Sequence, residues 1–338
     1  MNIDACSKRF MSPATLKPAL SIFSFIAATL GYTVAQAAAQ EWPTKPVRMV
    51  TGSAAGAGVG DTLGRYVAEK LTTYNGQTFL IDNRPGAAGN LGAGIVARAN
   101  PDGYHLLFTP GSVLTMNPSL YKEMPFDTES FAPVSLLADM AVLLVVHAKN
   151  PAKNIGEFIA AAKREPGKMN FSSPGAGSSL HLTTELFQRV AGVTVQHIAY
   201  KGPEFVTAVM SGQVTGMFAN PAPVIPQIKA GTLRALAVAG AKRLPQLPDV
   251  PTTAEGGLDG FDISSWFGLV APAKTPRQVV TQLSAQVAKA LREPDAQQRL
   301  VEFGVRPIGS NPEEFAEFLK KDRAKWDGVI RAANIRLD

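Results

Sequence analysis

The segment FSSPGAGSSLHLTTELF, residues 171–187, places hydroxyl, imidazole and glycine residues where an apolar run meets a helical pattern. The run that leads to Phe171 predicts a strand, and the apolar spacing after Ser179 predicts a helix. A glycine-rich elbow between a strand and a helix suits three kinds of site: a nucleotide phosphate, a serine nucleophile or a small anion.

A catalytic site is the less favoured interpretation of this elbow. Ser178 and His181 lie three residues apart, but no G-x-S-x-G motif is present and no third group is evident to orient the imidazole. A secreted hydrolase acting through these two residues remains an unlikely alternative. His181 and Glu185 are spaced as a helical pair, yet no H-E-x-x-H motif accompanies them. We therefore predict no catalytic residue, no metal and no enzymatic activity.

A second elbow follows the first predicted strand, in VRMVTGSAAGAGVGDTLGRYVAEKL, residues 47–71. Gly56, Gly58 and Gly60 resemble the start of a dinucleotide fingerprint, but Asp61 stands where G-x-G-x-x-G requires its third glycine. A carboxylate there would repel a pyrophosphate. No G-x-x-x-x-G-K-[ST] loop is present either, so we predict no cofactor.

The anion interpretation accounts for both elbows. Glycines allow close backbone approach, and the free N–H groups at the start of the next helix favour a negative charge. Further candidates follow other predicted strands or begin a helix. Four have open alternatives: Asp61 and Asn90 are ligand contacts or helix caps, and His181 is a hydrogen-bond donor to a ligand oxygen or to neighbouring backbone. Lys201 faces either the cleft or solvent. The predicted ligand-binding residues are Ala55, Gly56, Ala57, Gly58, Asp61, Asn90, Ser112, Ser173, Gly175, Ser178, Ser179, His181, Tyr200, Lys201, Gly202 and Asn220.

The elements that must position these residues alternate along the chain. Short β-rich runs and helical patterns form a first block from residue 47, and the pattern restarts after a long apolar stretch, residues 131–148. Such alternation predicts mainly parallel sheets in two α/β lobes, with a ligand cleft at the carboxyl ends of the strands. Asn311, Pro312 and the acids after them predict the start of the last helix. The tryptophans are expected to serve packing rather than stacking on a ligand.

The first forty residues are typical of a secretory leader. Lys8, Arg9 and Lys17 precede an apolar run that ends in small residues, which predicts a signal peptide over residues 1–39. The single cysteine, Cys6, lies within it, so no disulfide is expected in the exported protein. The 33 basic and 27 acidic residues are spread along the chain without a basic cluster, so we expect no nucleic-acid partner.

The motifs together resemble one receptor family, the Bug (TctC-like) extracytoplasmic solute receptors of tripartite tricarboxylate transporters. The resemblance covers nearly the whole chain after the leader. It is carried by EWPTKPVRMV, DNRPGAAGNLGAGIVARANPDGYHLLF, SSPGAGSSLHLTTELF, YKGPEFVTAVMSGQVTGMFAN, IKAGTLRALAVAGAKRLPQLPDVPTTAEGGLDGFDISSWFGLVAPAKTP and PEEFAEFLKKDRAKW.

The resemblance implies a type II periplasmic-binding-protein fold, with lobe 1 formed by residues 40–138 and 257–338 and lobe 2 by residues 139–256. It also implies a monomeric periplasmic receptor that closes on a small carboxylate and serves membrane permease subunits. In the family, elbows from both lobes hold the carboxylate, partly through water. The matching stretches here are Ser53 to Asp61 and Ser172 to His181, with Tyr200 to Gly202 and Asn220 nearby.

This sequence departs from the family pattern at two places. The first elbow, SAAGAGVGD, is longer than the usual form and lacks its proline. Ala219 stands where relatives often have aspartate, which removes a carboxylate from the predicted cleft. Both differences leave the identity of the carboxylate open. A receptor that signals through a sensor kinase, in place of a permease, is the alternative from another functional class.

Overall fold

The computed structural model describes residues 42–56 and 58–337, and the chain from Lys45 onward forms one compact unit. The predicted signal peptide, residues 1–39, and the candidate residue Ala57 lie outside the described residues. Among the residues described, no helix is both long and apolar enough to cross a bilayer.

The first set of strands is parallel and is connected by helices. β1 (Val47–Thr51) lies between β2 (Phe79–Asn83) and β3 (His105–Pro110) and pairs with both in parallel. Four of the five β1 residues are buried, because apolar side chains cover both faces of the strand. The connections contain α2 (Gly58–Asn75), and η1 (Ala87–Gly89) followed by α3 (Asn90–Ala97).

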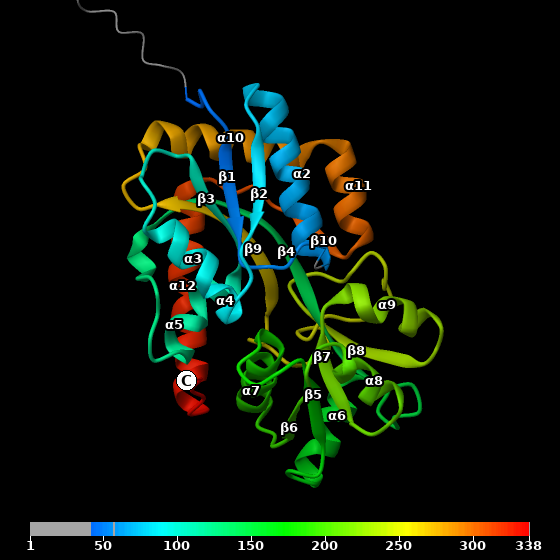
Figure 1. The fold of residues 1–338 in the computed structure, drawn as a ribbon. Coiled ribbons are helices and arrows are strands. Elements are labelled where there is room, and N and C mark those ends of the chain that lie inside the picture. The colour runs from blue at the N-terminus through cyan, green and yellow to red at the C-terminus, as the bar shows by residue number, and fades with distance from the viewer. Residues whose placement is uncertain (1–41, 57, 338) are drawn as a thin grey trace, which may run out of the picture. The chain divides into compact units, whose positions relative to one another are not determined.

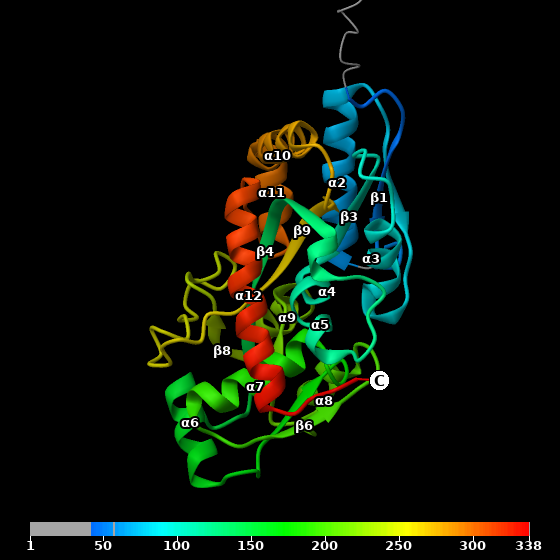
Figure 2. The same cartoon turned by 90° about the vertical axis from the view of Figure 1, so that its left-hand side faces the viewer.

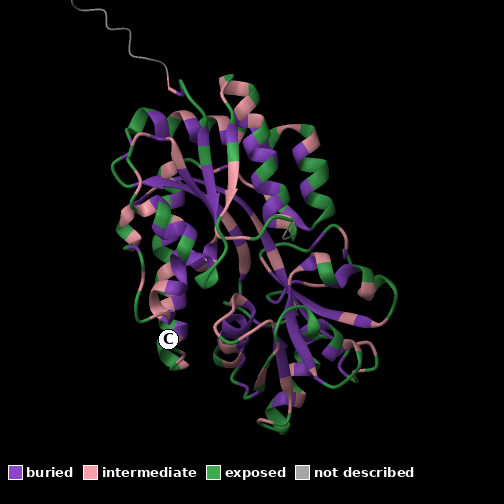
Figure 3. Ribbon diagram, in the orientation of Figure 1, coloured by how far each residue is buried: buried purple, intermediate pink, exposed green. Residues whose placement is uncertain are grey.

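Two long strands cross the middle of the unit (Figure 1). β4 (Phe131–His147) and β9 (Ser264–Pro272) are antiparallel, and β3 pairs with β9 on its other edge. The first part of β4 pairs with β9 and with β10 (Val305–Pro307), and its last part pairs with strands of the second set. β4 is buried along most of its length, as Figure 3 shows. It therefore belongs to both halves of the sheet.

The second set of strands repeats the parallel arrangement. β5 pairs in parallel with β6 and β7, and β4 pairs antiparallel with β7 and β8. β5, β6 and β7 each lead into a helix. The elements are α6 (Ile155–Arg164), β5 (Asn170–Ser173), α7 (Ser179–Ala191), β6 (Gln196–Ala199), α8 (Glu204–Met210), β7 (Gly216–Ala219), α9 (Pro221–Lys229) and β8 (Leu233–Ala239).

The last helix, α12 (Pro312–Ala332), packs into two hydrophobic clusters. Phe315 belongs to the cluster of the first strand set, and Trp326 belongs to that of the second. Figure 2 shows α12 beside the short helices α4 (Gly111–Thr115) and α5 (Asn117–Leu120). The predicted start is confirmed by a capping box, in which Asn311 and Glu314 each accept the other's backbone N–H.

The strands and helices alternate as predicted, but the pairing is mixed. Parallel pairs connect the outer strands of each set, whereas β4 and β9 are antiparallel to every partner. The prediction of mainly parallel sheets thus holds among β1, β2 and β3 and among β5, β6 and β7, because two chain crossings run through the centre. The proposed lobe boundaries stay a prediction. The remaining elements are η2 (Thr128–Ser130), α10 (Arg277–Arg292) and α11 (Pro294–Glu302).

Candidate ligand-binding site

A small cavity lies where the two strand sets meet, and we call it the strand-end cavity. Its volume is about 120 Å³, which corresponds to roughly four water molecules. No charged side chain occurs among the described residues that line it. The lining residues are Pro110, Gly111, Ser112, Met116, Met140, Ser179, Thr183, Asn220, Ile263, Ser264, Ser265, Trp266, Phe267 and Trp326.

Three predicted ligand-binding residues meet at this cavity. Ser112 lies in α4, directly after β3, and Ser179 is the first residue of α7, which follows β5. Asn220 directly follows β7 and is the N-cap of α9. The strand-to-helix junctions of both strand sets therefore open onto one space. This is the arrangement in which open α/β sheets bind ligands.

The start of α7 offers backbone donors to the cavity. Ser178 caps the helix by accepting the His181 N–H at 3.2 Å, and Leu182 N–H binds the Ser178 carbonyl. The N–H groups of Ser179 and Leu180 lie ahead of the first intrahelical carbonyl, so the helix itself provides them no acceptor. With the helix dipole, they favour an anion at this end of the cavity.

Asn220 supplies a side-chain donor on another wall. Its Oδ1 accepts a hydrogen bond from Ser265 Oγ at 3.0 Å, which orients the amide. Its Nδ2 group donates to no other residue in the described part of the chain. The helix after it begins Pro221, Ala222, Pro223, and prolines have no N–H. The Asn220 amide therefore replaces backbone donors that this helix start lacks.

Two tryptophans form an apolar part of the lining, and one buried carboxylate holds both. Asp322 Oδ2 accepts the Trp266 indole N–H at 3.0 Å, and Asp322 Oδ1 accepts that of Trp326 at 3.1 Å. The Thr115 hydroxyl also donates to Asp322, at 2.9 Å. Because both indole N–H groups are bonded away from the cavity, the rings offer it apolar surface. The predicted packing role of these tryptophans is thus only part of what they do, because both also line the cavity.

The glycine-rich elbow before α7 is held together by its own side chains. Ser173 Oγ, fully buried, donates to the Gly175 carbonyl at 3.0 Å and lies 2.7 Å from His197 Nε2. Burial, with the neighbouring His181 as a smaller cause, lowers the pKa of His197 to about 4. The rings of His181 and His197 stack with centroids 3.6 Å apart. These contacts fix the elbow that presents α7.

The structure places one ring nitrogen of His181 against backbone. Its Nδ1 accepts the Gly177 N–H at 3.0 Å, so only Nε2, 3.5 Å from Glu185 Oε1, is left to donate, and the predicted bond to a ligand oxygen stays a prediction. Ser178 Oγ donates to the Gly175 carbonyl at 2.7 Å, and no bond joins this hydroxyl to the His181 ring among the described contacts. The pair therefore lacks the geometry of a nucleophile and its base. The hydrolase alternative loses its support.

Asp61 organises the first elbow. Its carboxylate accepts the Gly56 N–H at 3.1 Å and two hydrogen bonds from Arg65, at 2.7 and 3.2 Å. The Arg65 guanidinium, with the Gly56 N–H, holds the pKa of Asp61 below its usual value. With its oxygens bonded in this way, Asp61 does not line the strand-end cavity. Asp61 lies in the first turn of α2, which begins at Gly58, so it is not the cap of a helix that starts at Thr62, and its direct ligand contact stays a prediction.

The rest of the first elbow also lies outside the cavity lining. Ala55, Gly56 and Gly58 are exposed, and Gly56 and Gly58 have φ of 72° and 67°, which explains the glycines. The elbow reaches the cavity indirectly, because the Phe267 ring, which lines it, packs against Gly60.

Asn90 and the residues after β6 have other surroundings. Asn90 is buried and its Oδ1 accepts from Asn117 at 2.7 Å, while Gly89 is the N-cap of α3, so both expected roles of Asn90 are unsupported. Tyr200 binds the Ser173 carbonyl through its N–H, beside the second elbow. Lys201 and Gly202 are exposed and do not line the strand-end cavity.

Sequence reasoning missed most of the apolar lining. Thr183 had a usable pattern, because it lies one helical turn after Ser179. Met140 and Ser265 carried none, since they face each other only through the register of β4 and β9. Trp326 lies in α12, more than a hundred residues after Ser179 and Asn220 in the chain. It reaches the cavity only through the packing of that helix.

Comparison with known proteins identifies the fold and the family. The model of the tripartite tricarboxylate transporter family receptor matches residues 63–335, most of the chain. The protein belongs to this receptor family. The resemblance noted from its motifs is thereby confirmed, and so is the periplasmic-binding-protein fold class.

The relatives of this receptor include curated and solved proteins. Protein BugT of Bordetella pertussis is 32% identical over 321 residues, 94% of this chain and 98% of BugT. A Rhodopseudomonas palustris protein solved with adipate is 34% identical, with a TM-score of 0.75, over 88% of this chain and 99% of that one. MatC from Rhodopseudomonas palustris, solved with bound malate, is 31% identical, with a TM-score of 0.70, over 86% of this chain and 100% of MatC.

Proposed function

We propose that this protein is a periplasmic solute-binding receptor that captures a small organic carboxylate and delivers it to a tripartite tricarboxylate-type membrane transporter. It binds its ligand and does not turn it over. The observation that carries the proposal is the meeting of Ser112, Ser179 and Asn220, from three strand ends, at one uncharged cavity. The leader predicted over residues 1–39 supports the periplasmic location.

The donors of the cavity suit a carboxylate. One carboxylate oxygen receives the N–H groups at the start of α7, and the Asn220 Nδ2 group reaches the ligand from the start of α9, in the same strand set. Hydrogen bonds to an ionised acceptor are stronger than those between neutral groups. The absence of acidic side chains from the described lining matters as much, because a nearby carboxylate would repel the ligand.

The apolar lining favours a ligand with a hydrocarbon body. Trp266, Trp326 and the two methionines offer van der Waals contacts that a fully hydrated ion cannot use. The relatives solved with adipate and malate support an organic acid as the ligand class. Binding between the two strand sets links ligand capture to their closure, the motion by which two-lobed receptors enclose a ligand.

A ligand screen with one matched variant pair tests the function. Mono-, di- and tricarboxylates are screened by thermal shift at low salt, and hits are titrated by calorimetry. A ligand at 100 times its dissociation constant adds about 2.7 kcal/mol of stability. Asn220→Asp places a like charge beside the ligand and is expected to weaken binding about a hundredfold or more.

Asn154→Asp is the control for this substitution. Asn154 caps α6, away from the cavity, and aspartate caps a helix as well as asparagine does. Its affinity should equal that of the wild type. A panel that leaves the melting temperature unchanged, or a hit that binds Asn220→Asp as tightly as wild type, would refute the proposed site.

A further inference from the structure

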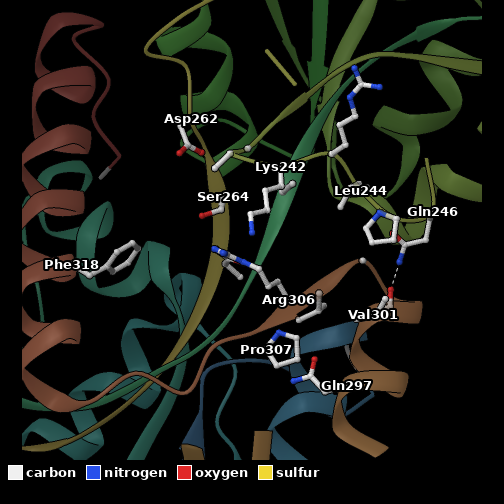
Figure 4. Close-up of a pocket in the computed structure, with 18 residues that line it drawn as sticks. Lys242, Leu244, Gln246, Asp262, Ser264, Gln297, Val301, Arg306, Pro307 and Phe318 are labelled. Carbon is white, nitrogen blue, oxygen red and sulfur yellow. Dashed lines mark hydrogen bonds and ion pairs between the residues drawn. The ribbon is translucent and has the colours of Figure 1, made fainter. Parts of the chain in front are cut away.

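A second and larger cavity lies beside the crossing of β4 and β9, and we call it the Lys242 cavity (Figure 4). Its volume is about 400 Å³, within the range of small-molecule sites. It is lined by a loop after β8, by the edge strand β10 and by parts of α11 and α12. Its lining includes Asp139, Lys242, Leu244, Gln246, Arg306 and Phe318.

Two cationic side chains converge inside this cavity. Figure 4 shows Lys242 and Arg306 pointing toward each other. Arg306 is compensated by Asp139, which accepts from its Nε at 2.9 Å and from its Nη2 at 2.5 Å. Lys242 has no ion-pair or hydrogen-bond partner among the described residues. Two like charges directed at one space favour an anion between them.

The other charges of the lining leave Lys242 available. Arg243 pairs with Glu255, with its Nε 2.8 Å from Oε2. Asp262 is exposed and forms no ion pair in the described part of the chain, although its charge acts on Arg306. Around these charges the wall is apolar, with Leu244 and Phe318 on opposite sides. The cavity therefore offers one cation without an ion-pair partner, Lys242, beside an apolar wall.

An unsatisfied polar atom also points to a missing occupant. Gln246 Oε1 is buried and has no hydrogen-bond partner in the described part of the chain, while its Nε2 donates to the Val301 carbonyl. Buried polar atoms are rarely left unpaired in folded proteins. A hydroxyl or amide hydrogen of a ligand, or a water held with it, would satisfy this oxygen.

The Lys242 cavity and the strand-end cavity use the same two strands. Met140 and Ser265, which pair in register, line the strand-end cavity, and the neighbouring pair, Ala141 and Ser264, lines the Lys242 cavity. Ser264 lines both cavities, so the two are adjacent at this point of β9. Trp266 lines the first cavity, and its ring packs edge-on against Phe318, which lines the second, with centroids 5.3 Å apart.

We propose that the Lys242 cavity is a second binding site, for a small molecule that carries one anionic head group on an apolar body. The head group lies between Lys242 and Arg306, and the body lies against Phe318 and Leu244. Because the two cavities share β4, β9 and the Trp266–Phe318 contact, occupancy of one changes the affinity of the other. By linkage, this change is the same in both directions.

Octanoate is the probe for this site, and octanamide is its neutral counterpart. Both are titrated by calorimetry into Asn220→Asp, in which the strand-end cavity is closed to carboxylates. Octanoate is expected to bind, and octanamide to bind at least about tenfold more weakly, since it cannot make the charge-assisted bonds. Hydrogen exchange should show protection of residues 240–246 on addition of octanoate.

Three substitutions in the same background locate the binding. Lys242→Gln should weaken octanoate about tenfold or more, whereas Asp262→Asn, which removes a nearby negative charge, should strengthen it. Lys163→Gln, on the exposed face of α6, is the matched control and should change nothing. With the strand-end cavity intact, octanoate should shift the affinity of the strand-end ligand more in the wild type than in Lys242→Gln, since direct competition at the strand-end cavity is the same in both.

The proposal is overturned by any of three results. These are no octanoate binding to Asn220→Asp, equal affinity of Lys242→Gln and Lys163→Gln, or protection confined to the start of α7. If Asn220→Asp proves unfolded by circular dichroism, Ser179→Asp serves as the background, because it also places a carboxylate in the strand-end cavity. The test stays independent of the proposed function, since it needs no ligand at the strand-end cavity.

Discussion

At the scale of single residues, the stacked rings of His181 and His197 both pack together and form hydrogen bonds within the elbow. His197 stays neutral because its ring is half-buried and lies against His181, and these effects outweigh the opposite effect of the Glu185 charge. Its Nε2 also lies 2.7 Å from the Ser173 hydroxyl that closes the elbow. A proton on His197 would place a charge in this packed cluster, so the elbow that presents α7 depends on pH.

This gives a pH prediction with a defined sign. The pKa of His197 is about 4 in the folded protein and about 6.5 when unfolded, so the unfolded chain binds the proton first as the pH falls. Stability is therefore complete above pH 6.5 and is lost between pH 6.5 and 4. The loss is at most about 3 kcal/mol, and less to the extent that water screens the half-exposed ring.

Urea unfolding at pH 7.0 and 4.5 measures this loss, and His197→Gln is the comparison. Glutamine can still bond Ser173 but has no proton to gain, so its stability should change less over this window. Asp61, whose pKa is lowered, loses its contribution only at still lower pH and does not interfere. Equal pH dependence in the two proteins would contradict the assignment.

At the scale of elements, the start of α4 is packed directly against the lining of the strand-end cavity. A Cβ on Gly111 would clash with the Trp266 indole, whose N–H is bonded to Asp322. Gly111→Ala is therefore expected to cost about 1–3 kcal/mol and to displace the indole. Ligand affinity should fall and tryptophan fluorescence should change, as measured by urea unfolding, titration and emission spectra.

Gly328→Ala is the control for that substitution. Gly328 lies in α12 with nothing within 4 Å of the position of an added Cβ, so alanine there should be neutral or stabilise by up to about 1 kcal/mol. Equal effects of the two substitutions on stability and ligand affinity would show that the Gly111–Trp266 contact does not determine either of them.

The elements also show what the sequence can predict. The strand and helix patterns, the start of α12 and the two elbows are local, and periodicity or spacing was enough to locate them. The role of Asp61 is harder to predict, because only the structure shows that its carboxylate accepts hydrogen bonds from Arg65 and from the Gly56 N–H. The stack of His181 on His197 needs the register of β5 against β6, which places His197 opposite Phe171.

The cavity lining also shows that contacts between residues far apart in the sequence cannot be predicted from local patterns. Ser112, Ser179 and Asn220 follow strands, and their position at strand ends is a rule that sequence can apply. Trp266 and Trp326 come from an antiparallel crossing strand and from the last helix, and Asp322 joins them only in the folded chain. No spacing in the sequence connects these three residues with the elbows.

At the scale of the whole molecule, β4 makes the two strand sets mechanically dependent on each other. One continuous strand pairs with β9 and β10 in its first part and with β7 and β8 in its last part. α12 contributes Phe315 to one hydrophobic cluster and Trp326 to the other. Separate lobes usually unfold separately when few contacts cross between them, but here a strand and a helix are shared.

We therefore predict that the chain from Lys45 onward unfolds in one cooperative transition. Leu137→Ala and Leu144→Ala each remove a fully buried side chain, one from each part of β4, at a cost of about 2–5 kcal/mol. In differential scanning calorimetry both variants should lower the same single transition, because neither strand set can lose β4 and persist. Two transitions, with Leu137→Ala lowering only one and Leu144→Ala only the other, would instead show two independent lobes and would support the boundaries at residues 138 and 256.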